Sequence, residues 1–133
     1  MEMNDSGFLH CACATSVAAY TAVVLDSDGV GVKTAGAGDD LDLYGVSLAQ
    51  PSIDDGVDIV LQGYHGSRFL TGRAAITAGA LVAVTTGGKF VTATNQRPVY
   101  RAKTACAGDD AIFAAIPLNA GELLEAYLHT IGS

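Results

Sequence analysis

Short runs of β-branched and apolar residues recur along the chain, with turn residues between them. Residues 17–25 are rich in Val, Ala, Thr and Tyr and end at an Asp-Ser-Asp-Gly turn. Residues 77–84 and 90–94 flank a Gly-Gly pair, which tolerates the positive φ that a hairpin turn demands. Turns of this kind return every eight to twelve residues or so, and the pattern predicts an all-β fold of about ten short strands.

One eight-residue stretch occurs twice. Residues 33–40 read Lys-Thr-Ala-Gly-Ala-Gly-Asp-Asp, and residues 103–110 differ only in having Cys106 where the first copy has Gly36. The offset is 70 residues (103 − 33), and the residues that follow each copy are similar. We interpret this as a pseudo-twofold internal repeat, each copy a turn followed by two strands. A single turn sequence used twice is the alternative.

The C-terminal stretch fits two kinds of secondary structure. Its apolar residues have the spacing of a short amphipathic helix: Leu123, Leu124, Tyr127, Leu128 and Ile131. The corresponding part of the first copy, residues 57–61, has a β pattern instead. We expect a strand at 123–129, because two copies of one repeat should fold alike.

Residues 1–16 show no clear periodicity, which predicts an extended N-terminal arm ahead of one β-rich domain at 17–133. Three cysteines cannot all pair within one chain, so we expect folding in a reducing cytoplasm without a disulfide framework. His10, Cys11 and Cys13 lack the second ligand pair that zinc sites need, so we expect no metal site.

Half of the residues are hydrophobic and only 16% are charged, which is apolar for a small monomer. Part of this apolar surface is therefore expected in a subunit interface. The net charge of −7 and the scattered basic residues argue against a nucleic-acid partner. No apolar run is long enough to predict a membrane span.

The sequence contains no catalytic motif that we recognise. Two pairs of carboxylates, Asp39/Asp40 and Asp109/Asp110, each follow a glycine. Aspartate is common at such positions because its side chain bonds to nearby backbone groups, so we expect turns here rather than acid–base chemistry or cation binding. We expect no enzyme activity and no cofactor.

Several segments together resemble a known family. They are residues 76–84, the Gly-Gly-Lys turn and strand at 87–93, the Ala-Gly-Asp-Asp step at 107–110, and the closing residues 115–122. This series is similar to the capsid decoration, or cement, proteins of tailed bacteriophages, and the similarity covers about residues 17–129.

The resemblance implies a small barrel or β-tulip-like domain that binds the outside of the assembled phage head. Such proteins often form homotrimers that clamp neighbouring major capsid proteins, so the protein would be made in the host cytoplasm and end on the capsid exterior of the virion. Many weak contacts across capsomer seams would resist internal pressure through avidity.

Apolar residues of the arm and loops are the expected contacts with capsid or neighbouring subunits: Phe8, Leu9, Tyr64 and Phe69. Two other functions remain open from the sequence. One is a virion-displayed β-domain that binds carbohydrate or a host surface. The other is a small enzyme that uses the four aspartates of the two acidic pairs.

Overall fold

The computed structural model describes residues 2–3, 8–13, 16–27, 29, 31–39, 42–48, 56–64 and 66–118. In this part of the chain the protein is all-β, as the alternation of apolar and turn residues predicts, with its strands in two antiparallel sheets. Two expectations fall outside it, namely the strand at 123–129 and the environment of Asp40.

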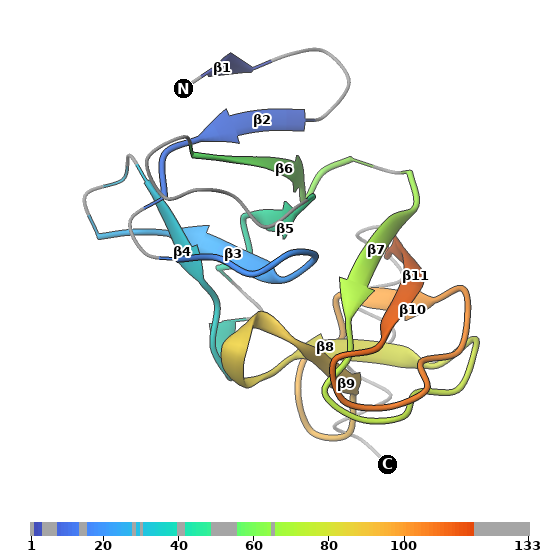
Figure 1. The fold of residues 1–133 in the computed structure, drawn as a ribbon. Coiled ribbons are helices and arrows are strands. Elements are labelled where there is room, and N and C mark those ends of the chain that lie inside the picture. Colours follow the sequence, from blue (N-terminus) through green and yellow to red (C-terminus); the bar gives the residue numbers. More distant parts are fainter. Residues whose placement is uncertain are drawn as a thin grey trace.

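Figure 1 shows the two sheets as separate groups of strands. The first has the order β1-β2-β6-β5-β3-β4. Its strands are β1 (Glu2–Met3), β2 (Phe8–Cys11), β3 (Ala22–Leu25), β4 (Val32–Thr34), β5 (Gly45–Ser47) and β6 (Val57–Leu61).

The second sheet has the order β7-β11-β10-β8-β9. Its strands are β7 (Arg68–Thr71), β8 (Leu81–Val84), β9 (Phe90–Thr92), β10 (Tyr100–Ala102) and β11 (Ile112–Pro117). The predicted hairpin turn between β8 and β9 is present as the 3-10 turn Thr86–Gly88. In the described pairings neither sheet closes on itself, although one parallel bridge from Gly72 to Phe90 joins the β7 end of the second sheet to β9.

The strand order of the second sheet repeats that of the first. Strands β2 to β6 are arranged β2-β6-β5-β3-β4, and β7 to β11 are arranged β7-β11-β10-β8-β9, which is the same order five strands later. We call these the first unit and the second unit. Even the irregular parts match, since the parallel bridge from Cys13 to Val32 has its counterpart in that from Gly72 to Phe90.

Main-chain hydrogen bonds outside the ladders repeat as well. Tyr44 N donates to Val23 O at 3.0 Å, and Val99 N donates to Val82 O at 2.9 Å. The offset is 59 residues between the two acceptors (82 − 23) and 55 between the two donors (99 − 44). The connections of the second unit are therefore slightly shorter.

This repetition does not coincide with the repeated eight-residue sequence. Lys33 and Thr34 lie in β4, whose counterpart is β9, whereas Lys103 and Thr104 follow β10. The predicted offset of 70 residues is therefore wrong, and the matching stretches belong to different places in the two units. A turn sequence rich in Gly and Asp suits several turns, so its recurrence does not identify equivalent strands.

Equivalent backbone positions in the two units carry different residues. Tyr20 has φ of 55° and its counterpart Gly79 has φ of 89°, so one left-handed turn is built with a tyrosine once and a glycine once. Their N–H groups donate to equivalent carbonyls, those of Ser47 and Ala102, at 3.1 and 2.8 Å. The fold repeats through alternation and turn geometry, which leave little identity for a sequence comparison to detect.

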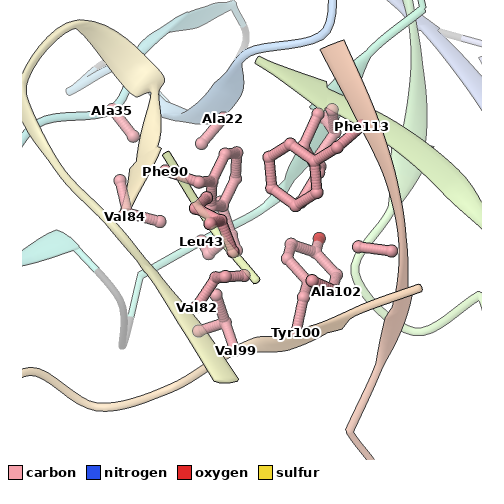
Figure 2. Packing of buried hydrophobic residues seen from close by; sticks show 14 of the residues in the cluster. Ala22, Ala35, Leu43, Val82, Val84, Phe90, Val99, Tyr100, Ala102 and Phe113 are labelled. Atoms are coloured by element: carbon pink, nitrogen blue, oxygen red, sulfur yellow. The ribbon is translucent and has the colours of Figure 1, made fainter. Parts of the chain in front are cut away.

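The main core lies between the two sheets and contains residues from both units. Figure 2 shows the rings of Phe90, Tyr100 and Phe113 gathered beside Ala22 and Leu43. Phe90 and Tyr100 meet edge to face, with ring centroids 5.6 Å apart. Because this one cluster joins the units, they form a single body rather than two independent domains.

A second, smaller core belongs to the first unit alone. It includes Leu9 and Cys11 of β2, which alternate with the exposed His10. Strand β2 pairs with β6 over four residues, from Phe8 opposite Val60 to Cys11 opposite Val57. Residues 8–13 are thus an integral part of the first sheet, whereas the sequence had suggested an arm separate from the domain.

Candidate interaction surface

Strands β7 and β11 present large apolar side chains to solvent. Phe69 is 56% exposed, Ile112 45% and Ile116 38%. Each lies beside a buried neighbour in its strand, because successive side chains point to opposite faces of a sheet. The buried partners Leu70, Phe113 and Ala115 fill the space under the sheet. Strand β11 is therefore apolar on both of its sides, in contrast to a strand whose solvent-facing side is polar.

The register places these side chains on one continuous surface. Phe69 lies opposite Ala114, in the middle of β11, and Ile116 lies opposite Arg101 of β10. The ring of Tyr20 packs edge-on against Phe69, with centroids 5.8 Å apart. We call Phe69, Ile112, Ala114 and Ile116 the outer face of the second sheet. Exposed apolar patches of this kind mark association sites.

Strand β7 is also an edge of its sheet. Thr71 N donates to Tyr20 O at 2.8 Å, on the side away from β11. Main-chain groups of alternate residues point the same way in an antiparallel strand, so the N–H and C=O of Phe69 face the same open side. An edge of this kind is a template for another strand.

Charge is divided unevenly between the two units. Six of the seven basic residues lie between positions 68 and 103: Arg68, Arg73, Lys89, Arg97, Arg101 and Lys103. Ten of the fourteen acidic residues lie between positions 2 and 58: Glu2, Asp5, Asp26, Asp28, Asp39, Asp40, Asp42, Asp54, Asp55 and Asp58. The first unit is therefore strongly acidic and the second is basic, which the overall net charge conceals.

The four contact residues suggested by the sequence lie in different environments. Leu9 is only 2% exposed and belongs to the smaller core, so it is not available as a contact. Phe8 and Tyr64 are half-buried and pack on each other, with ring centroids 5.3 Å apart. Phe69 is the one of the four that offers a large exposed surface. Residues 112–117 form a continuous apolar run, so no pattern in the sequence indicates that Ile112 and Ile116 face solvent while Phe113 is buried.

The connection between the two units is held by a buried arginine. Arg68 is 4% exposed and donates to the main-chain carbonyls of Leu61, Tyr64 and Gly66. It also donates to the hydroxyl of Tyr100, over whose ring its guanidinium lies at 5.1 Å. One forked cation thus satisfies the carbonyls of a connecting loop, a role that its position in the sequence does not reveal.

Tyr100 completes this cluster. Its hydroxyl bonds to the side-chain amide oxygen of Gln62, and its ring is fully buried. Burial raises the pKa of Tyr100 to about 12, and the nearby Arg68 opposes part of that rise. The phenol is therefore neutral at physiological pH, and its environment is that of a structural hydrogen-bond donor.

The acidic pair of the second unit is bound to a lysine. Lys89 Nζ lies 2.6 Å from Asp110 Oδ1 and 3.1 Å from Asp109 Oδ1. The hydrogen bonds that Lys89 donates to Asp110 and, to a smaller extent, to Asp109 raise the pKa of Lys89. The pair therefore ties its loop to the residue that precedes β9.

In the first unit, Asp39 Oδ2 accepts a hydrogen bond from Gly36 N at 2.8 Å, which is the turn role that the sequence predicts. Asp39 and Asp42 also line an open depression of about 370 Å³ beside Leu25 and Lys33. Asp109 and Asp110, which are bound to Lys89, are not among the residues that line this depression.

The three cysteines are free thiols. Burial raises the pKa of Cys11 above its usual value, and burial also raises the pKa of Cys13, which disfavours the reactive thiolate. Among the described residues, no three His, Cys, Asp or Glu side chains come together as a metal site. Nor does the described part contain a helix long and apolar enough to cross a membrane.

No protein-family model matches this chain. No curated protein matches it either.

Proposed function

We propose that this protein is a structural virion protein that binds the outer surface of an assembled phage head and stabilises contacts between major capsid proteins. The observation that carries the proposal is the outer face of the second sheet, where Phe69, Ile112 and Ile116 stand exposed on paired strands. A surface built on a sheet is held rigidly, so binding it costs little ordering entropy.

The resemblance to decoration proteins supplies the identity of the partner. It also supplies the finer architecture, in which the two sheets form a β-tulip-like or barrel-like body and three copies form a homotrimer. The protein would act without catalysis, after synthesis in the host cytoplasm, on the capsid exterior. Because each contact is small, many copies per head would be needed for a measurable gain in strength.

The test mixes purified protein with expanded heads that lack their decoration protein and measures co-sedimentation and resistance of the heads to heat. Phe69→Ser should weaken binding about tenfold or more, because a large aromatic anchor carries much of the energy of an interface. Leu25→Ser is the matched control, since Leu25 is also an exposed apolar strand residue, 40% exposed, but lies in the first sheet.

Binding that both variants retain would remove the outer face as the capsid contact. If the wild-type protein neither binds heads nor protects them from heat, the proposed function is wrong. A glycan-binding screen run with the same protein separates the other virion function, since specific hits without head binding would favour a carbohydrate-binding domain.

A further inference from the structure

The repetition of strand order exposes one difference between the units. In the first unit, the open side of β2 is covered by β1, with Glu2 opposite His10 and Met3 opposite Leu9. In the second unit, β7 takes the place of β2, and Phe69 is the counterpart of His10. Beside β7, the described part of the chain places no strand, so β7 is an edge of its sheet.

The main chain of β7 is suited to accept such a strand. Thr71 N already uses the open side of β7 to reach Tyr20 O. The N–H and C=O of Phe69 point to that same side, two residues earlier. The side chain of Phe69 is exposed, so a strand that arrives at this edge also covers apolar surface.

Strand β1 is the complementary edge. It is the terminal strand of the first sheet, so one of its two sides faces away from β2 in the described pairing. It belongs to the acidic part of the chain, with Glu2 in the strand itself. Strand β7 lies in the basic unit, where Lys103 Nζ donates to Ser67 Oγ, just before β7, at 3.5 Å, and Arg101 lies two strands away in β10. Opposite charges on the two edges favour this pairing over β1 with β1 or β7 with β7.

We propose that the partner at the β7 edge is a second copy of this chain, whose strand β1 adds to β7 and joins the first sheet of one copy to the second sheet of the next. The contact is heterologous, because two different surfaces meet. Repeated around an axis it closes a ring, and without closure it gives a growing chain. Each copy would then have its β1 and β7 edges paired, which removes two of the sheet ends at which uncontrolled aggregation could start.

This inference rests on the proposed function in that it specifies how copies of the chain associate, but it is tested on the purified protein alone. A negative result here leaves binding to heads untouched, and heads that fail to bind leave self-association untouched. The measurement is sedimentation velocity of the full chain across a hundredfold range of concentration, at low and at high salt. We expect concentration-dependent assembly of the wild-type protein that weakens at high salt, because opposite charges are screened.

Two variants remove one side of the contact each. A protein that lacks residues 2–5 has no β1 to donate, and Phe69→Pro removes the outward N–H of β7, a change that edge strands tolerate. Each variant alone should be monomeric. Phe69→Ala is the control for the side chain, since it keeps the N–H and should still associate.

Mixing gives the decisive result. The variant without residues 2–5 still has an intact β7, and Phe69→Pro still has an intact β1, so an equal mixture should form a one-to-one dimer and nothing larger. A mixture that stays monomeric would overturn the proposal, as would a wild-type protein that is monomeric at every concentration or variants that assemble like the wild type. If circular dichroism shows that Phe69→Pro does not fold, Phe69→Lys replaces it, because a charge at an edge also opposes strand addition.

Discussion

The buried Arg68 offers the sharpest test of how the two units are held together. Its guanidinium donates to three main-chain carbonyls of the connecting loop and stacks on two tyrosine rings, those of Tyr64 and Tyr100. In Arg68→Met the side chain keeps an unbranched apolar stem but is shorter and loses every one of these hydrogen bonds. The loop carbonyls would then lose their donor while they remain partly buried.

The size of the effect follows from two opposing terms. A hydrogen bond to a charged group contributes about 1.5–3 kcal/mol, whereas burying a charge costs several kcal/mol. The second term is not fully offset here, because Arg68 Nε has no hydrogen-bond partner in the described part of the chain. We expect Arg68→Met to lower the free energy of unfolding by about 3 kcal/mol, and Tm by about 10 °C for a domain of this size.

Urea unfolding followed by far-UV circular dichroism measures this change, since the chain has no tryptophan. The matched control is Arg101→Met, because Arg101 is exposed and, within the described residues, its side chain donates one hydrogen bond, to Gly79 O at 3.0 Å. That control should stay within about 0.5 kcal/mol of the wild type. If the two variants are equally stable, or if Arg68→Met is the more stable, the guanidinium does not hold the connection and the reasoning fails.

Three further changes test other parts of the structure. Burial raises the pKa of Tyr100 to about 12, so the folded state keeps the phenol proton to higher pH than the unfolded state. The contribution of Tyr100 to stability is therefore complete below about pH 10 and is lost between about pH 10 and 12. In Tyr100→Phe the free energy of unfolding should fall less steeply with pH in this range, and an unchanged slope would contradict the reasoning. Gly45→Ala should destabilise the fold by about 2 kcal/mol or more, because the new Cβ would lie 2.3 Å from Val60 O, while Gly63→Ala, with open space around it, should be close to neutral in the same urea assay. Lys89→Met should lower Tm by only about 1–3 °C, and not at all in high salt, because it removes ion pairs with the two exposed aspartates Asp109 and Asp110. A large, salt-independent loss of Tm in scanning calorimetry would contradict this assignment of the cluster as a screened surface ion pair.

The fold class was predictable because it depends on local patterns. Alternation and turn residues marked the strands at 22–25 and 81–84, and the Gly-Gly pair marked the hairpin between β8 and β9. These signals lie within a few residues of each other, so no knowledge of the rest of the chain is needed. The pairing of residues 8–11 was not predicted, because β2 is recognisable as a strand only once its partner β6 is known.

The repeat and the interaction surface were harder to read. The visible match at 33–40 and 103–110 led to an offset of 70, whereas the strands repeat at offsets near 55 to 59 with almost no residue identity. Arg68 carries no sequence signal, since whether an arginine is buried depends on which carbonyls the distant loop brings to it. The sequence suggested Phe69 as a contact residue but not Ile112 or Ile116 of β11, because a face shared by two strands appears only when the register is known.

A chain in which the same strand order occurs twice can mispair while it folds, since a strand of one unit can take the place of its counterpart in the sheet of the other unit. The two cores differ in the size of their side chains at equivalent places. Val57 corresponds to Phe113, Ile59 to Ala115 and Val32 to Phe90, all of them buried. An exchanged strand would force a phenylalanine into a space for valine or leave a void where isoleucine belongs, and each error costs on the order of 1–3 kcal/mol. The differences in side-chain size between the two units therefore favour the correct strand pairing during folding.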